Sequence, residues 1–316
     1  MRPAGRARPG VPAAHADASD DGLLKPSLWL MGVRPRTLTL ALVPVLVGSA
    51  LAWRDAAQPE WLVFLVTLFS ACCIQAGTNL FNDVSDAERG NDRIDRLGPT
   101  RVTGSGLASP RQVRKTARLL FLLALLGGAY LVATGGWPIL VIGVASLLAG
   151  WAYSGGPRPL SYTPWGEVFV IIFFGLAAVA GSHYLQAGTF SSEALLVGLV
   201  LGLQAAAVLL LNNLRDHASD LRAGRSTLVQ LTGLGMAYRI YGLLMLAPFP
   251  LLAWIFHPGA LGVAWATLPF VIWLVWRCMK LPPSPAMNGQ LALTAFSQLL
   301  FGGLLVSSWL LPGLPG

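Results

Sequence analysis

The sequence predicts an all-α integral membrane protein in which nine transmembrane helices form a bundle. Of its 316 residues, 54% are hydrophobic and only 11% carry a charge. A soluble domain of this size would need more charged surface, whereas about 20 consecutive apolar residues are enough to cross a bilayer as a helix. Nine such runs follow one another along the chain: 27–53, 61–80, 115–134, 136–153, 165–187, 193–214, 236–256, 259–279 and 290–311.

The N-terminal segment differs from the rest of the chain. Residues 1–24 are rich in Ala, Pro, Gly and charged residues and contain no apolar stretch. We therefore expect a disordered tail there, because a signal peptide would need an apolar centre. Residues 25–316 then form one nine-helix transmembrane domain.

The basic residues predict how the bundle is oriented. When the chain alternates through nine spans, 21 of the 22 Lys and Arg residues fall on the side of the N-terminus, and only Arg54 falls on the other. By the positive-inside rule, we expect a cytoplasmic N-terminus and an extracytoplasmic C-terminus. The net charge of +8 then follows from topology, and we expect no nucleic-acid binding, because the basic residues lie at helix ends beside acids.

The long, polar connections all fall on the predicted cytoplasmic side, where we expect the active-site loops. In the longest, 81–114, Ser109, Pro110 and Gln112 form the pattern of a capping box with proline at the first helical position. The third helix should therefore begin near Pro110 and project from the membrane before crossing it. Gly90 is expected to end the helix of the second span.

The first of two acidic clusters lies at the end of the second span. Asn79, Asp83 and Asp86 are separated by four and three residues, so they share one face of a helix, and Asn82 lies four residues before Asp86. After the helix ends, Asp92 should fold back towards the same site. Carboxylates at the edge of a membrane span are costly unless they are paired or bind a metal ion.

The second cluster lies at the end of the sixth span. Asn212, Asp216 and Asp220 are spaced by four residues and should form a single stripe on one helix. Three arginines of the same segment are suited to clamping phosphate oxygens: Arg215, Arg222 and Arg225.

Two facing stripes of carboxylates would bind divalent cations between them. Oxygen ligands without His or Cys suit Mg²⁺, which commonly shares its ligand shell with substrate phosphates. Magnesium and guanidinium groups around a diphosphate would ionise it as a leaving group. The alternative is that the acids are solvated charges at helix ends, but two Asn-led stripes on one side of the membrane favour the site.

At these motifs the sequence resembles the UbiA-type superfamily of intramembrane prenyltransferases, and within it the 1,4-dihydroxy-2-naphthoate polyprenyltransferases of menaquinone biosynthesis. The likeness extends over roughly residues 27–311. It is carried by RPRTLTLALVPVLVG (34–48), NLFNDVSDAERGNDRIDRLGPTRVTGSGLASP (79–110), YSGGPRPLSYTPWGEVFVIIFFG (153–175) and NNLRDHASDLRAGRSTL (212–228). The resemblance implies nine helices, with the acidic motifs on the second and sixth.

The resemblance also implies roles for the polar residues. Four carboxylates would hold Mg²⁺ against the prenyl diphosphate: Asp83, Asp86, Asp216 and Asp220. Three amides would assist them: Asn79, Asn82 and Asn212. Four arginines would take up the charge that grows on the departing pyrophosphate: Arg215, Arg222, Arg225 and Arg101. The four carboxylates and Arg225 are the expected catalytic residues.

The aromatic acceptor implied by the resemblance is 1,4-dihydroxy-2-naphthoate. Its ring would attack C1 of the prenyl cation in an interior that excludes water, and loss of CO₂ would give a demethylmenaquinone. Four residues could orient it, with loop packing or interfacial anchoring equally open for each: Tyr153, Tyr162, Glu167 and Arg36. The expected location is the cytoplasmic (inner) membrane of a bacterium.

The sequence departs from the family pattern at two positions and leaves three rival functions open. Arg225 stands where the family commonly has Lys, and His183 where a small hydroxylated residue is expected, so His183 either contacts the acceptor or is packed in the span. The rivals are a prenyltransferase with another acceptor, such as 4-hydroxybenzoate or homogentisate, a secondary transporter, and a non-catalytic scaffold. A transporter site would lie near the bilayer midplane, whereas these charges lie at helix ends.

Overall fold

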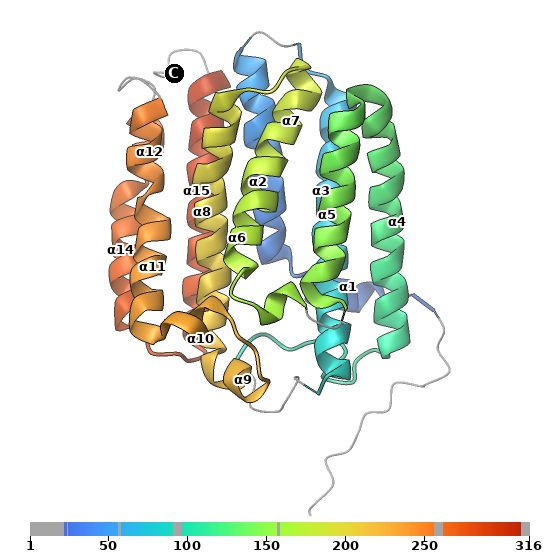
Figure 1. Ribbon diagram of the computed structural model, residues 1–316, viewed down its shortest axis with the longest axis vertical. Coiled ribbons are helices and arrows are strands. Elements are labelled where there is room, and N and C mark those ends of the chain that lie inside the picture. The colour runs from blue at the N-terminus through green and yellow to red at the C-terminus, as the bar shows by residue number, and fades with distance from the viewer. Residues whose placement is uncertain are drawn as a thin grey trace, which may run out of the picture.

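The computed structural model describes residues 22–23, 25–55, 58–90, 97–156, 159–255 and 262–310, and every regular element in these parts of the chain is helical (Figure 1). Eight segments of the described chain are long and apolar enough to cross a membrane. They are α2 (Pro35–Arg54), α3 (Trp61–Glu88), α4 (Pro110–Gly135), α5 (Trp137–Ser154), α6–η2–α7 (Gly166–Ala187), α8 (Ser192–Arg215), α11–α12 (Leu234–Trp254) and α15 (Met287–Leu310). The prediction of a multi-pass helical membrane protein is therefore confirmed.

Shorter helices connect or extend these spans. They are α1 (Pro26–Val33), η1 (Leu160–Tyr162), α9 (His217–Arg222), α10 (Leu228–Thr232), α13 (Gly262–Trp265) and α14 (Leu268–Lys280). Within the longer segments, α6 covers Gly166–Val170, η2 Ile171–Ala177, α7 Ala178–Ala187, α11 Leu234–Leu246 and α12 Pro248–Ile255. Residues 1–21 and 24 lie outside the described residues, so the tail predicted for 1–24 stays a prediction.

Two predicted spans are interrupted. The span expected at 27–53 breaks at Arg34, which has a left-handed φ of 54°, because the following Pro35 disfavours the α conformation of the residue before it. The span expected at 259–279 is divided between α13 and α14 in its described part. Pro269 cannot continue α13, because its ring would clash with the carbonyl of Trp265. The count of nine spans therefore stays a prediction.

The predicted ends of the second and third helices are confirmed. α3 ends at Glu88 and Gly90 follows with a φ of 71°. α4 begins at Pro110 with the expected capping box: the Ser109 hydroxyl accepts from the Gln112 N–H at 3.2 Å, and the Gln112 side chain accepts from the Ser109 N–H at 3.0 Å. The first acidic motif thus stands in the last turns of α3.

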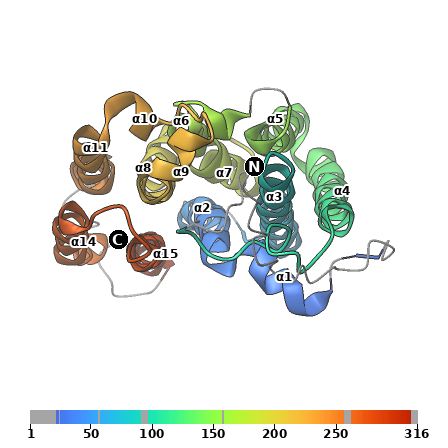
Figure 2. The same ribbon diagram turned by 90° about the horizontal axis from the view of Figure 1, so that it is seen from below.

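Different elements lie at the two ends of the bundle. The end of α3, the end of α8, and helices α1, α9 and α10 lie in the lower part of Figure 1, whereas α7 ends and α8 begins at the upper end. Figure 2 shows the lower end face-on. Two apolar clusters run through the bundle: one joins α8 to α2, α11, α14 and α15, and the other joins α3 to α4. The second cluster also contains Val102 and Ala108, so the loop before α4 is anchored to the bundle.

A contact between glycines fixes the fifth span against α8. A Cβ on Gly175 would lie 2.3 Å from the Gly198 carbonyl oxygen and 2.7 Å from Gly202 Cα, so only glycine allows this approach. Gly175 lies in the π-helical turn η2, a feature often found near functional sites. This packing sets the position of α6 beside the end of α8.

Candidate active site

Asp86 is the centre of a buried ion-pair cluster at the lower end of the bundle. It is 1% exposed. Its Oδ1 lies 2.6 Å from Arg225 Nη2, and its Oδ2 lies 2.6 Å from Arg101 Nη2. One carboxylate on α3 therefore holds both the loop before α4 and the segment between α9 and α10.

Arg225 joins the two acidic motifs. Besides Asp86, its guanidinium lies 3.3 Å from Asp220 Oδ1, and it stacks on the Tyr162 ring at 4.6 Å from the centroid. Burial alone would lower the pKa of Arg225, but the Asp86 and Asp220 carboxylates outweigh it and raise the pKa above its ordinary value. Arg225 therefore remains a cation between two acids.

Asp83 holds the loop backbone. Its Oδ2 accepts from the Val102 N–H at 3.0 Å, and its Oδ1 accepts from the Thr103 N–H at 2.9 Å. The next residue back in the loop, Arg101, also donates to the Asn82 carbonyl oxygen at 2.9 Å. The loop is thus placed against α3 by the same motif that the sequence assigned to metal binding.

Asp216 is paired within its own segment. The Arg215 guanidinium donates to both Asp216 oxygens, at 2.8 and 2.6 Å, and to Asn212 Oδ1 at 2.6 Å. It also donates to Asn288 Oδ1 at 2.7 Å, and Asn288 donates to the Leu97 carbonyl oxygen at 2.9 Å.

The second stripe is not one uninterrupted helix, because α8 ends at Arg215 and α9 begins at His217. Helical hydrogen bonding nevertheless continues through Asp216, which donates its N–H to the Asn212 carbonyl oxygen and accepts from the Asp220 N–H.

The remaining amides of the first motif fasten neighbouring helices. The Asn79 side chain donates to the Val33 carbonyl oxygen at 2.8 Å and to Thr37 Oγ1 at 3.1 Å, across the break at Arg34. The Asn82 side chain donates to Ser154 Oγ at 2.9 Å.

The residues predicted to orient the acceptor or to bind phosphate differ in burial. Tyr153 is half-buried and interacts electrostatically with Glu167, Arg225, Asp86 and Arg34. Glu167 is buried, and its Oε1 accepts from Asn213 Nδ2 at 2.9 Å. By contrast, two predicted substrate-binding residues have exposed side chains: Arg36 and Arg222.

Three polar residues of the site were not singled out from the sequence. Arg89 donates to the Ser154 and Gly156 carbonyl oxygens and lies over the Tyr162 ring at 5.4 Å. Its place inside the first acidic motif was a signal that could have found it. Arg34 precedes a proline in a motif that the sequence did highlight. Asn288 stands in no polar pattern, and only the tertiary structure brings it to Arg215.

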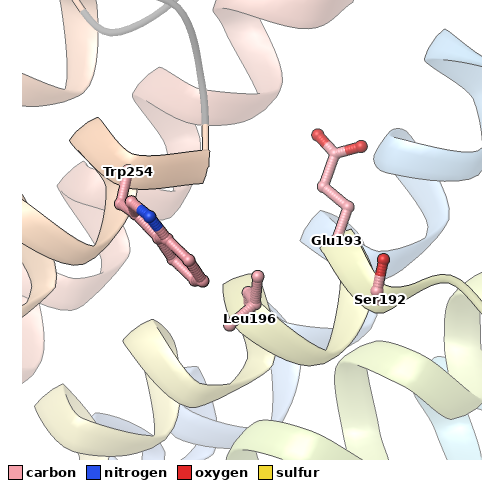
Figure 3. A pocket seen from close by; sticks show the side chains of 4 residues that line it. All are labelled: Ser192, Glu193, Leu196 and Trp254. Carbon is pink, nitrogen blue, oxygen red and sulfur yellow. The ribbon is translucent and has the colours of Figure 1, made fainter.

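His183 and a cavity that the site does not use lie at the other end of the bundle. His183 is buried, with Nδ1 at 3.2 Å from the Thr189 carbonyl oxygen near the end of α7, so it is a packed histidine. The cavity, of about 320 Å³, is lined by Ser192, Glu193, Leu196 and Trp254 (Figure 3). An α-helix rises about 1.5 Å per residue, so α8 separates this cavity from Asp216 by about 35 Å.

The ion-pair cluster has the chemistry of a divalent-cation site. In the part of the chain that the structure describes, no three acidic, His or Cys side chains meet closely enough to hold a metal by themselves. However, Asp86 and Asp220 come from different helices, are buried, and face one shared cation, Arg225. These oxygen donors fit Mg²⁺ that completes its shell with phosphate oxygens. Asp92 lies outside the described residues.

The fold and site define a multi-pass membrane protein with buried acids and arginines gathered at one end of its bundle. Residues 41–300 match the UbiA prenyltransferase family, and the chain belongs to that family. The prediction of a membrane-embedded prenyltransferase is thereby confirmed.

Similar proteins agree with this assignment. The chain is 34% identical over 297 residues to the 1,4-dihydroxy-2-naphthoate octaprenyltransferase of Escherichia coli, covering 89% of this chain and 96% of that protein. It is 38% identical over 221 residues to the protein of the same name from Mycobacterium tuberculosis, covering 69% and 75%. A UbiA homologue from Archaeoglobus fulgidus, solved bound to GPP and Mg²⁺, shares the fold with a TM-score of 0.63 at 15% identity, covering 88% and 99%.

Proposed function

We propose that this protein transfers a polyprenyl group from its diphosphate to 1,4-dihydroxy-2-naphthoate, releasing pyrophosphate and CO₂ and forming a demethylmenaquinone. The observation that carries the proposal is the cluster of Asp86, Arg225 and Asp220, in which two acidic motifs share one buried cation. The names of the Escherichia coli and Mycobacterium tuberculosis relatives support the naphthoate acceptor.

In this proposal four carboxylates hold Mg²⁺: Asp83, Asp86, Asp216 and Asp220. When bound, Mg²⁺ supplies positive charge that stabilises the departing pyrophosphate. Both Asp83 oxygens accept loop N–H groups, but each carboxylate oxygen has a second lone pair that remains available to a metal. The Archaeoglobus fulgidus homologue described with GPP and Mg²⁺ supports the choice of metal and donor.

Arginines of the cluster bind the diphosphate. Arg101, Arg215 and Arg225 are all held in place by carboxylates or amides, so their positions are set before a substrate enters. Guanidinium groups suit phosphate oxygens because they donate in a planar fork. Arg222 is exposed at the end of α9, and we propose that it attracts the diphosphate from solvent.

The apolar bundle accommodates the prenyl tail and keeps water from the allylic cation. Because the cluster lies where α3 and α8 leave the apolar segment, C1 of the donor would meet the ring at the edge of the membrane. We further propose that this edge faces the cytoplasm of a bacterium, because nearly all Lys and Arg residues lie on that side in the predicted topology.

The test uses membranes that contain the protein. They are incubated with Mg²⁺, dihydroxynaphthoate and prenyl diphosphates of several lengths, and the products are identified by mass. Parallel reactions replace dihydroxynaphthoate with 4-hydroxybenzoate or homogentisate. We expect a prenylated product that has lost CO₂ from dihydroxynaphthoate alone; a product from another acceptor only would contradict the naphthoate assignment.

A further inference from the structure

Glu167 is a buried carboxylate that the diphosphate site does not use. It is 4% exposed and lies in the first turn of α6. Its Oε1 accepts from Asn213 Nδ2 at 2.9 Å. Its Oε2 is also buried and has no hydrogen-bond partner among the described residues. A buried carboxylate oxygen without a donor is costly, so a donor from a ligand would satisfy it.

Glu167 lies beside the ion-pair cluster. Its partner Asn213 follows Asn212, which binds Arg215 through Oδ1. The Tyr153 hydroxyl interacts electrostatically with Glu167 and also with Arg225 and Asp86 of the cluster. Tyr153 therefore lies within electrostatic range both of the groups that would hold the diphosphate and of Glu167.

The surrounding helices hold Glu167 in place. A Cβ on Gly166 would lie only 3.2 Å from Leu209 Cδ2 of α8, and Gly175 packs directly on Gly198 and Gly202 of the same helix. These contacts leave α6 little freedom to move relative to α8. The Glu167 carboxylate is thus held rigidly, as a group that takes a proton from a substrate needs to be.

We propose that Glu167 binds and activates the aromatic acceptor: Oε2 accepts a hydrogen bond from a ring hydroxyl and takes its proton during transfer. This inference rests on the proposed function, because it assigns a residue to the acceptor of that reaction. The ring then carries more electron density at the carbon that attacks the prenyl group.

The electron and proton balance closes without a further reactant. The ring carbon that bears the carboxylate gives an electron pair to prenyl C1, and the pair of the C1–O bond leaves with pyrophosphate. Loss of CO₂ returns the pair of the ring–carboxylate bond to the ring. The proton returns from Glu167 to the hydroxyl oxygen, so Glu167 is unchanged after each turnover.

The experiment measures acceptor binding and turnover separately, in purified full-length protein. Glu167→Gln removes the charge with little change of shape, and Glu167→Asp keeps the charge but withdraws the oxygen. Glu60→Gln is the matched control, because Glu60 is exposed and lies at the start of α3, far from the acids in the last turns of that helix. Dissociation constants are measured for dihydroxynaphthoate and for each of its two mono-O-methyl ethers, with thermal unfolding to confirm that each variant is folded.

We expect Glu167→Gln to lower turnover about 100-fold, as for loss of a general base, and to weaken dihydroxynaphthoate binding about tenfold, as for loss of one charged hydrogen bond. Affinity for a thio analogue of the prenyl diphosphate should stay unchanged. The wild type should bind one of the mono-O-methyl ethers more weakly than it binds dihydroxynaphthoate. Glu167→Gln should bind that ether and dihydroxynaphthoate equally well. Glu167→Asp should fall between wild type and Glu167→Gln.

Two results would overturn the role of Glu167. One is equal binding of dihydroxynaphthoate by wild type and by folded Glu167→Gln; the other is an O-methyl penalty that persists in the variant. If Glu167→Gln does not fold, the same ether comparison in Glu167→Asp decides. A wrong proposed function would give a different result: the wild type would bind or prenylate none of the naphthoate compounds.

Discussion

The two acidic motifs look alike in sequence but are built differently. On α3, Asp83 and Asp86 belong to one continuous helix, and their partners lie in other segments: a loop backbone, Arg101 and Arg225. At the end of α8, Asp216 pairs with the adjacent Arg215, at the point where the helix gives way to α9. The first motif therefore organises the site, whereas the second is largely organised within itself.

Removal of the divalent metal should have the largest effect, because it affects both motifs at once. We expect EDTA to abolish prenyl transfer and Mg²⁺ to restore it, since the proposed ligands are all oxygen donors. The measurement is product formation in washed membranes before and after adding Mg²⁺. Full activity in EDTA would exclude metal-assisted ionisation of the diphosphate.

Asp86→Asn should be the most damaging single change. We expect turnover to fall by about three orders of magnitude, which corresponds to about 4 kcal/mol of lost transition-state stabilisation. The folded state should also lose about 3–5 kcal/mol, because Arg101 and Arg225 would stay buried without their shared counter-charge. Steady-state rates and thermal unfolding in detergent measure the two effects.

Asp216→Asn sharpens the contrast between the motifs. Turnover should fall by about two orders of magnitude through loss of a metal ligand. Stability should change less than for Asp86→Asn, because Arg215 keeps its bonds to Asn212 and Asn288. A folded Asp216→Asn protein with wild-type turnover would leave Asp216 as a helix-end charge.

Arg225→Lys tests the bridge between the motifs. Arg225 contacts Asp86 and Asp220 through different nitrogens and stacks on Tyr162, and a lysine ammonium cannot reproduce that planar arrangement. We expect turnover to fall by about 10- to 30-fold, or about 1.4–2 kcal/mol. Unchanged turnover, measured at saturating Mg²⁺, would mean that Arg225 acts only as a point charge.

Glu88→Gln should have the smallest effect. Glu88 follows Asp86 by two residues but pairs with Arg114 at the surface, and exposed ion pairs contribute about 0–1 kcal/mol. Turnover and unfolding temperature should match the wild type. A large loss of turnover would extend the first motif beyond the face that carries Asp83 and Asp86.

The sequence predicted the helical membrane fold and the residues that gather at one end, because hydrophobic runs and helical spacing are local properties. It did not predict the helix breaks at Arg34 and near Thr267. Pro35 follows directly on Arg34, and Pro269 lies two residues after Thr267. Nor could it predict that Arg225 joins Asp86, or that Asn288 reaches Arg215, because residues far apart in the chain meet only after packing. Packing also decides that Arg36 is exposed whereas Arg34, two residues before it, is half-buried.

The shared position of Arg225 makes two ligands thermodynamically dependent on each other. An anion that takes the donors of Arg225 leaves Asp86 and Asp220 without part of their counter-charge, and so increases their affinity for a cation. A cation bound to those acids frees Arg225 for an anion. By linkage, each ligand must raise the affinity of the other by the same factor. Metal and diphosphate should therefore enter this protein as cooperative ligands, each binding weakly when the other is absent.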